Sequence, residues 1–448
     1  MKNQFRLAAA LWVLTLFPMF AWSSPSTTTL KLNLPVERYR LPNGLTVLLY
    51  VDRGAPLITY HTWFKVGSRD EQPGTTGIAH LFEHLMFKGA KRHGPKAFDK
   101  VMQANGGTNN AFTSHDYTGY FETLPADKLE IAMDLESDRM ENLQLTEENL
   151  KSEREVVKEE RRYRVENDVT GRLFEETYST VFKVHPYRWP VIGWMDDLAR
   201  ITVEECQKFY KTYYAPNNAV IVLAGDFNKA EAKKLLVKYY GHIPSQEIPP
   251  RIVPAEPKQT EARENIFERE VQSDYLSLAF PNAPAGAPDY YALDVLQLIL
   301  GEGSSSRLYK RLVYEAQIAS WVGVSNSGSK DPGLFSVIAA LKPGASQKKL
   351  ERMIFDELNR ARTQLYSEGE IQKAKNKIMT ANVGTLKTLY GKAQALAFNE
   401  VVMGSYEFLH KDLERYNKVT AQQIQKAAKT FLGDQQRNLI VQKVKAKQ

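Results

Sequence analysis

The feature that most limits how this chain can fold is an internal repeat of a helix and the strand that follows it. Segments 202–214 and 420–432 match at Thr, Gln, Lys, Lys and Thr with one constant offset. An apolar run follows each segment, at 219–224 in the first half and at 438–441 in the second. Because the helix and its strand recur together, the pattern indicates a duplicated folding unit.

Strand-like patterns precede long helical patterns in both halves, for example at 45–50 and at 275–280. Strands followed by helices in this way are typical of a sheet with helices packed on it. We therefore predict an α+β fold with two homologous domains, each with helices packed on a mostly antiparallel sheet.

A proline-rich stretch separates the two predicted domains. Its prolines, at positions 244, 249, 250, 254 and 257, lie among polar residues. Proline removes a backbone hydrogen-bond donor and fixes φ, so this stretch favours neither a helix nor a central strand. We expect an N-terminal domain at 30–243, a linker at 244–263 and a C-terminal domain at 264–448.

The first 23 residues have the layout of a secretory signal peptide. Lys2 and Arg6 precede an apolar run at 7–21, and serines follow it. The run is shorter than the ~20 residues that span a bilayer, and Pro18 interrupts it. We therefore predict a periplasmic or secreted protein with no stable membrane insertion after signal cleavage.

The charge of the 448-residue chain bears on its possible partners, and its cysteine content bears on disulfide formation. Lys and Arg number 59 and Asp and Glu 52, which gives a net charge of +7. This excess is spread along the chain instead of forming a basic arm, so we expect no nucleic acid partner. The single cysteine, Cys206, excludes an internal disulfide.

A short helical window at 77–87 contains His80, Glu83 and His84. Residues four apart lie on one helix face, so the two imidazoles can meet at a single point. Neutral imidazoles in this arrangement suit Zn²⁺, and Glu83 is near enough to take a proton from water at the metal. The spacing is His-x-x-Glu-His, the inverse of the more familiar zinc motif. The alternative interpretation is two surface histidines beside an incidental carboxylate.

A tetrahedral site that keeps one position for water needs a third protein ligand. The acidic helix at 147–164 offers two candidates, Glu153 and Glu160. At ~100° per residue these two share one face, together with the apolar residues Leu150, Val156 and Val157. A carboxylate on an apolar face is costly unless it is paired or coordinated. One of the two is therefore a candidate ligand and the other a candidate support for a ligand, but periodicity does not choose between them.

Several further motifs accompany these residues. They are the segments 64–68, 106–113, 185–187 with Gly193, and 214–218. With His80-Leu-Phe-Glu-His84, Glu153 and Glu160, they resemble the pitrilysin or insulinase-like (inverzincin) zinc metallopeptidases, in particular the short-chain members related to the mitochondrial processing peptidase. The resemblance covers essentially the whole chain after the signal peptide.

The resemblance implies a role for each matching residue. It implies that His80, His84 and Glu160 bind one Zn²⁺ per chain, that Glu83 is the general base, and that Glu153 supports the site without binding the metal. It also implies that an edge strand binds an extended peptide substrate through residues Asn110, Ala111, Phe112 and Thr113. The expected activity is that of a metalloendopeptidase acting on unfolded or extended polypeptides. The alternative is a non-catalytic peptide-binding or assembly subunit with a structural zinc.

The second half lacks the metal residues. Aligning Gly303 with Gly89 places Asp294, Gln297 and Leu298 where His80, Glu83 and His84 stand. We therefore expect one active site per chain.

The resemblance also implies an Arg and a Tyr in the second half that hold the substrate near zinc. An ungapped alignment places Val313 and Ser320 at these positions, whereas a shift of a residue or two would recruit Arg311 or Tyr314. If the pair is absent, a second chain must supply it. We expect a homologous partner subunit that provides the Arg and Tyr, or otherwise a homodimer.

Overall fold

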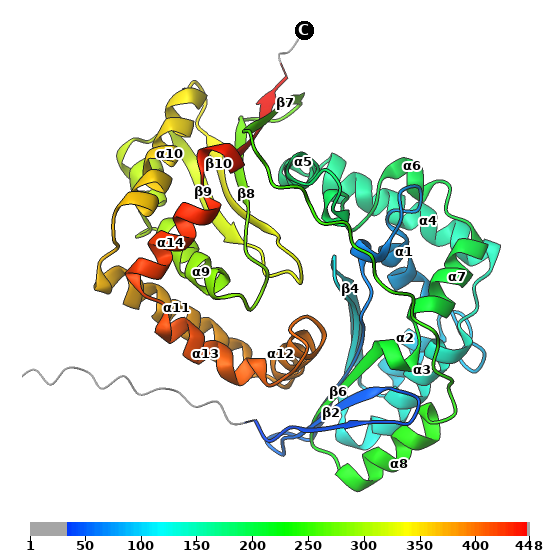
Figure 1. The fold of residues 1–448 in the computed structure, drawn as a ribbon. Coiled ribbons are helices and arrows are strands. Elements are labelled where there is room, and N and C mark those ends of the chain that lie inside the picture. The colour runs from blue at the N-terminus through cyan, green and yellow to red at the C-terminus, as the bar shows by residue number, and fades with distance from the viewer. Residues whose placement is uncertain (1–33, 446–448) are drawn as a thin grey trace, which may run out of the picture. The chain divides into compact units, whose positions relative to one another are not determined.

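Two β-sheets organise the part of the chain that the computed structural model describes, residues 34–445 (Figure 1). The first sheet has the strand order β1-β2-β6-β3-β5-β4. Its strands are β1 (Glu37–Arg40), β2 (Thr46–Val51), β3 (Leu57–Phe64), β4 (Thr108–Thr113), β5 (Thr118–Pro125) and β6 (Ala219–Gly225). Neighbours pair antiparallel except β2 and β6. Strand β6 lies between β2 and β3 and is buried along its whole length, which explains its continuous apolar run.

The second sheet repeats this arrangement. Its strands are β7 (Arg263–Arg269), β8 (Tyr275–Pro281), β9 (Ala319–Asn326), β10 (Leu334–Leu341) and β11 (Asn438–Val444). Their order is β7-β11-β8-β10-β9, and the parallel pair is β7 with β11. Apart from β1, the two sheets therefore match strand for strand. The predicted α+β class with two homologous domains and mostly antiparallel sheets is confirmed.

Helices cover the sheets and bury a hydrophobic core in each half. In the first half they are α1 (Ile78–Leu85), α2 (Ala97–Ala104), α3 (Leu129–Asn142), α4 (Glu147–Arg161), α5 (Val169–Val181), α6 (Met195–Leu198), α7 (Val203–Tyr213) and α8 (Lys229–Tyr240). In the second half they are α9 (Pro288–Gly301), α10 (Gln347–Thr363), α11 (Glu368–Thr385), α12 (Leu389–Val401), α13 (Phe408–Lys418) and α14 (Ala421–Phe431). The π-helical segment η3 (Arg162–Glu166) follows α4, and the π-helical segment η6 (Tyr309–Glu315) precedes β9.

The repeated helices α7 and α14 begin with the same capping arrangement. The hydroxyl of Thr202 accepts the backbone N–H of Glu205, whose carboxylate accepts the N–H of Thr202. Thr420 and Gln423 make the same exchange at the start of α14. Each pair satisfies backbone donors that the first helical turn leaves open. The matching threonines of the sequence repeat are therefore equivalent helix starts.

Each half contributes one helix to the sheet of the other half. Helix α5 belongs to the first half but packs on β8 and β11, where Leu173 joins Ile338 and Ile440 in one apolar cluster. Helix α12 belongs to the second half but packs on β3 and β6. Its Tyr390 ring lies 4.7 Å from the ring of Phe121 on β5. The two halves therefore share apolar contacts in both directions.

A largely buried polar cluster also joins the halves. Arg69 contacts Asp116 at 3.1 Å and Asp331 of the second half at 2.7 Å. Tyr187 donates a hydrogen bond to Asp116 at 2.6 Å, and His185 lies 3.1 Å from Asp331. Each carboxylate thus has more than one partner, as burial requires.

The segment between the two halves and the N-terminal segment were predicted to be a linker and a signal peptide. Residues 241–262 form neither helix nor strand, in line with their prolines. The predicted signal peptide at 1–23 lies outside the described residues. Within residues 34–445, no helix has both the length and the apolar character that a bilayer crossing requires.

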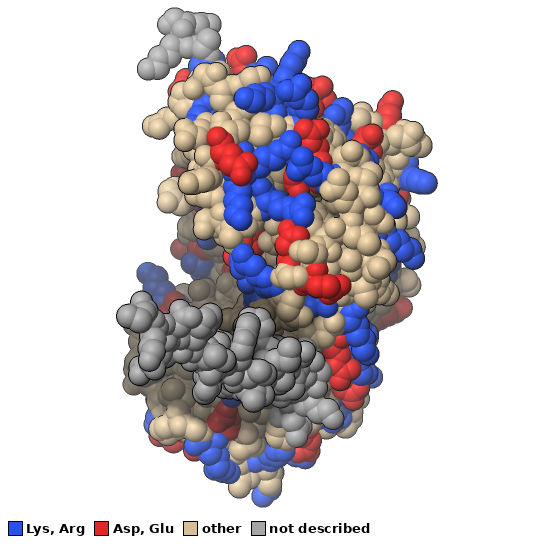
Figure 2. Space-filling view, turned by 90° about the vertical axis from the view of Figure 1, so that its left-hand side faces the viewer, with Lys and Arg blue, Asp and Glu red and all other residues tan. Residues whose placement is uncertain are grey.

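The surface charge is mixed in the view of Figure 2. Lys and Arg side chains gather on the upper part of this face, with Asp and Glu side chains between them. Charges of both signs interspersed in this way are ordinary for a folded protein and give no specific indication of nucleic acid binding.

Candidate metal centre and active site

The helix that carries the two predicted histidine ligands, α1, is tightly held at its start. Gly77 precedes it with a φ of 88°, a conformation that other residues rarely adopt. The buried carboxylate of Glu71 accepts the backbone N–H groups of Gly77 and Ala79, each at 2.9 Å. A Cβ atom on Gly77 would lie 2.5 Å from the carbonyl oxygen of Ile192. These contacts fix the position of His80, which follows within one turn.

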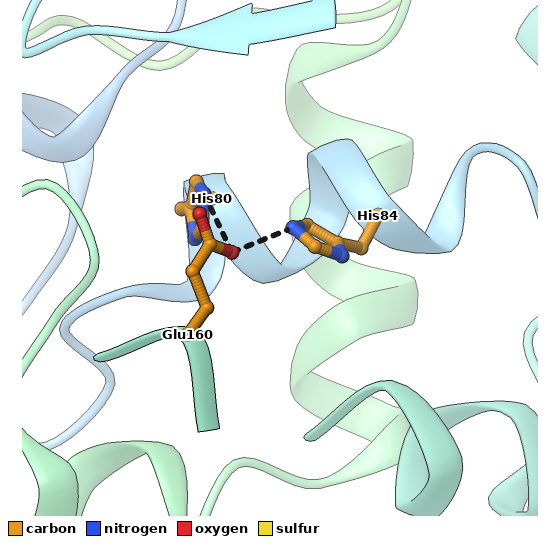
Figure 3. Close-up of side chains that lie close together, drawn as sticks. All are labelled: His80, His84 and Glu160. Atoms are coloured by element: carbon orange, nitrogen blue, oxygen red, sulfur yellow. Dashed lines mark ion pairs between the residues drawn. The ribbon is translucent and has the colours of Figure 1, made fainter. Parts of the chain in front are cut away.

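Three side chains from α1 and α4 converge on one point (Figure 3). Oε2 of Glu160 lies 3.3 Å from Nε2 of His84 and 3.7 Å from Nε2 of His80. One ligand atom from each residue lies within 4.8 Å of the other two. Two ligand atoms at about 2.1 Å from a tetrahedral ion are about 3.4 Å apart. The spacing therefore fits Zn²⁺ held by two imidazoles and one carboxylate.

The structure distinguishes the two glutamates that periodicity left equivalent. Glu160 belongs to the converging group, whereas Oε2 of Glu153 lies 3.4 Å from Nδ1 of His84, on the other side of that ring. Glu153 therefore contacts the ring nitrogen of His84 that does not face Glu160, and it lies outside the converging group. One neighbour on this face differs from the prediction, because Val156 is 46% exposed while Val157 is fully buried. Val156 lies at the margin of the predicted face, about 60° around the helix from Glu153.

Burial and charge act differently on the two histidines. Burial lowers the pKa of His80 to about 4, so its imidazole is neutral near pH 7. Burial alone would lower the pKa of His84 as well, but hydrogen bonds with Glu153 and Glu160 raise it to about 9. A metal binds the neutral imidazole. His80 is therefore ready to bind, and His84 must first lose a proton.

Glu83 lies on the same helix, with its carboxylate held by Thr113. Oγ1 of Thr113 donates a hydrogen bond to Oε2 of Glu83 at 2.5 Å. Burial raises the pKa of Glu83, and the hydrogen bond from Thr113 opposes this rise. A carboxylate with a raised pKa can exchange a proton more easily near neutral pH.

The predicted peptide-binding residues lie on β4, at the edge of the first sheet. β4 pairs with β5 on one side, and within the described residues no strand pairs with its other side. Asn110, Ala111, Phe112 and Thr113 line a cavity of about 810 Å³ together with the metal cluster and Glu83. The Phe112 ring packs on Trp63 at 5.1 Å, on the face of the strand opposite to Thr113. The structure therefore brings the four residues next to the cluster.

Two basic residues beside the cluster were not predicted. Nζ of Lys88 lies 2.5 Å from Oε1 of Glu153, and Nε of Arg164 lies 2.8 Å from Oε1 of Glu160. Arg164 follows Glu160 by four residues, the spacing of an ion pair along a helix, and this was the available signal. Lys88 follows α1, so only the tertiary structure relates it to Glu153.

The second half has no equivalent cluster among the described residues. Helix α9 carries Asp294, whose carboxylate accepts the hydroxyl of Tyr416 at 2.7 Å. Oε1 of Gln297 accepts the backbone N–H of Asn326 at 3.0 Å. The polar counterparts of His80 and Glu83 are thus used in hydrogen bonds within this half, and the counterpart of His84 is the apolar Leu298.

The two residues aligned with the implied Arg and Tyr make only local contacts. Val313, in η6, packs against the core of the second half. Ser320, in β9, donates a hydrogen bond to the carbonyl oxygen of Ala340 at 3.3 Å. Neither side chain has a group that could hold a substrate carboxylate or carbonyl in the way that Arg does.

Arg311 and Tyr314 have different surroundings. Arg311 contacts Asp356 at 3.0 Å and Glu357 at 3.4 Å, both on α10. Tyr314 is 76% exposed. Arg311 is therefore committed to ion pairs within the second half.

Comparison with known proteins finds family models and relatives that match most of the chain. The family model "Insulinase (Peptidase family M16)" matches residues 46–193, and "Peptidase M16 inactive domain" matches residues 200–378. Zinc protease PqqE from Helicobacter pylori is 34% identical over 345 residues, 76% of this chain and 77% of that protein. An uncharacterized zinc protease from Streptomyces coelicolor is 27% identical over 420 residues, 92% of this chain and 91% of that protein.

Solved structures of peptidases have the same fold as this chain. The crystal structure of a protease from Helicobacter pylori superposes with a TM-score of 0.87 at 30% identity, over 92% of this chain and 100% of that one. A peptidase-like structure from Alicyclobacillus acidocaldarius has the same fold, with a TM-score of 0.79 at 22% identity, over 93% of this chain and 100% of that one.

A duplicated α+β fold with an inverted His-x-x-Glu-His helix in its first half defines a two-domain metallopeptidase class. The chain belongs to peptidase family M16, the insulinase family. The resemblance inferred from the sequence motifs is thereby confirmed. The match to the family model "Peptidase M16 inactive domain" begins at residue 200, after the residues of the metal cluster.

Proposed function

We propose that this chain is a zinc-dependent endopeptidase that hydrolyses peptide bonds in unfolded or extended polypeptides. The observation that carries the proposal is the convergence of His80, His84 and Glu160 on one point, with Glu83 in the same cavity. A bound Zn²⁺ would polarise the scissile carbonyl group and make water a stronger nucleophile there. These two imidazoles and one carboxylate would hold one ion per chain.

Glu83 is the general base of the proposed reaction. Its carboxylate takes a proton from the attacking water and later delivers it to the nitrogen of the leaving amine. Thr113 engages Oε2 of Glu83, which leaves Oε1 for the water. Glu153 orients His84 through the contact between its Oε2 and Nδ1 of the ring, so that Nε2 is the metal-binding nitrogen.

The free edge of β4 is the proposed substrate-binding element. An extended peptide that adds to this edge gains backbone hydrogen bonds that do not depend on its side chains. This mode suits polypeptides without stable secondary structure, because a folded substrate would have to release a strand first. Asn110, Ala111, Phe112 and Thr113 provide the strand, and Thr113 connects it to Glu83.

A homologous partner subunit completes the proposed enzyme. Val313 and Ser320 offer no cationic or phenolic group, and Arg311 is paired with Asp356 and Glu357. The Arg and Tyr that the family resemblance implies therefore come from a second chain in this proposal. A heterodimer is proposed first, and a homodimer is the alternative.

Export from the cytoplasm is part of the proposal and is supported by the N-terminal sequence. The basic start, the apolar run at 7–21 and the serines after it form a signal peptide in sequence terms. The mature enzyme would then act in the periplasm or outside the cell.

The decisive experiment measures metal content and peptide hydrolysis on the same preparation. The isolated chain is tested with a quenched unstructured peptide, with and without chelator, and again with a homologous partner that lacks the metal motif. We expect one zinc per chain and cleavage that chelator removes and Zn²⁺ restores. Zinc without cleavage under all conditions would support the non-catalytic binding subunit instead.

A further inference from the structure

Two cations outside the proposed ligand set hold the two glutamates of the centre in the same way. Lys88 contacts Oε1 of Glu153 at 2.5 Å, while Oε2 of Glu153 faces Nδ1 of His84 at 3.4 Å. Arg164 contacts Oε1 of Glu160 at 2.8 Å, while Oε2 of Glu160 faces Nε2 of His84 at 3.3 Å. Each carboxylate is therefore divided, with one oxygen on a cation and the other toward an imidazole.

We propose that Lys88 and Arg164 are positioning residues of the metal centre. Arg164 occupies one oxygen of Glu160, so that this glutamate presents the other oxygen alone to the ion. Lys88 fixes Glu153, which in turn fixes the ring of His84 with Nε2 toward the ion. Neither cation touches the metal or the substrate in this proposal. The inference rests on the proposed zinc site and adds how its ligands are oriented.

Other ion pairs on the same helix serve as a comparison. Lys158 pairs with Glu155, and Arg162 pairs with Glu159, each three residues apart. The glutamates of these pairs are 59% and 69% exposed, whereas Glu153 and Glu160 are 4% and 17% exposed. An exposed pair contributes little because water and salt screen it. A pair that holds a largely buried carboxylate determines where that carboxylate points.

Lys88 and Arg164 have two opposite effects on zinc binding. Their positive charges repel the ion, whereas their contacts with the glutamates orient its ligands. Their side chains are 36% and 69% exposed, so solvent screens their repulsion of the ion. The contacts with the glutamates are direct and short, and residues that orient metal ligands typically change metal affinity by about 10- to 100-fold. We therefore expect weaker zinc binding when either cation is removed, despite the loss of positive charge.

The test measures the dissociation constant of Zn²⁺ by competition with a chromophoric chelator. Arg164→Gln and Lys88→Met are each expected to weaken binding by about 10- to 100-fold. Arg162→Gln and Lys158→Met, which remove the cations of the two comparison pairs with exposed glutamates, are expected to stay within about twofold of the unchanged chain. Arg164→Lys and Lys88→Arg, which keep a cation in place, are expected to recover part of the affinity.

A second readout separates orientation from a general loss of structure. In a Glu160→Gln background, adding Arg164→Gln is expected to change zinc affinity little, because the carboxylate that Arg164 orients is absent. The visible absorption of bound Co²⁺ is expected to change in Arg164→Gln, since it reports the number and geometry of ligands.

Unchanged or tighter zinc binding by Arg164→Gln and Lys88→Met would overturn the inference. An equal loss with and without Glu160 would overturn it for Arg164. If the unsubstituted chain itself binds no zinc, the proposed function fails. If it binds one zinc and the variants bind as tightly, only this inference fails.

Discussion

Thr113 and Glu83 are joined by a hydrogen bond of 2.5 Å between Oγ1 and Oε2. Thr113 is the last residue of the edge strand β4, and Glu83 lies on α1 between the two histidines. The bond therefore links the proposed substrate-binding strand to the proposed base. A peptide that adds to β4 lies beside a carboxylate whose position the same strand already fixes.

Replacing Thr113 by Val should move the acidic limb of the pH profile to higher pH. Burial already raises the pKa of Glu83, and the Thr113 hydrogen bond holds that rise down by stabilising the carboxylate. Without the bond the pKa rises further, so a larger fraction of Glu83 is protonated and inactive near neutral pH. The profile of kcat/KM against pH measures this shift. Thr113→Ser keeps the donor and should leave the limb in place.

Replacing Glu83 by Gln should stop hydrolysis and leave the metal bound. The amide cannot accept the proton of water, and general base catalysis of this kind contributes about 10²- to 10⁴-fold to the rate. His80→Ala should instead lose the metal together with the activity. Metal analysis and peptide hydrolysis on both variants separate the two effects, with the exposed Glu155→Gln as the control. A Glu83→Gln chain that cleaves at the original rate would refute the assignment.

Zinc uptake near pH 7 should release about one proton per ion. The metal-free His84 carries a proton there because its carboxylate neighbours raise its pKa to about 9, whereas His80 is already neutral. Binding requires the neutral imidazole, so the proton of His84 must leave. Titration with Zn²⁺ in a weakly buffered indicator solution counts the protons. Release that stays near zero at pH 7 would contradict the assigned charge of His84.

The metal-free chain should lose stability as the pH rises from about 6.5 to 9. The pKa of His84 is raised in the folded state, so its stabilising effect is complete below pH 6.5 and disappears as the pH passes about 9. The contribution is on the order of 3 kcal/mol. Urea unfolding in the presence of chelator, at pH 6 and at pH 9.5, measures it. His84→Gln should show a smaller loss between these two values than the unsubstituted chain.

Replacing Asp116 by Ala should destabilise the chain strongly. Asp116 is buried and accepts hydrogen bonds from Arg69, Tyr187 and the backbone N–H of Lys330 in the second half. Removing one partner from a buried ionic cluster typically costs about 3 to 5 kcal/mol. The free energy of unfolding in urea measures the effect. Asp127→Ala, an exposed acid in the same half, should change it by less than about 0.5 kcal/mol.

Local patterns predicted the parts of the molecule that local physics determines. The repeat of Thr202 and Thr420 corresponds to two capping boxes, and a spacing of four residues placed His80 and His84 on one face. The choice between Glu153 and Glu160 was not accessible, because the two differ by only about 20° around the helix. Their distances to His84 depend on how α4 crosses α1, which is a tertiary property.

The exchange of helices between the halves was also inaccessible from the sequence. Nothing in the periodicity of α5 or α12 indicates that each packs on the sheet of the other half. The same holds for the 46% exposure of Val156, which its position on the predicted face did not indicate. Long-range contacts of this kind are set by topology and not by neighbouring residues.

The helix exchange makes the half without metal residues indispensable to the half that has them. Cutting the chain within 241–262 and discarding the second part would uncover the outer face of β3, where His61 and Trp63 are fully buried. It would also leave Leu173 on α5 without the apolar cluster that it completes. We therefore expect that the first half does not fold as an isolated domain, because a helix of the half without the metal residues covers part of its sheet.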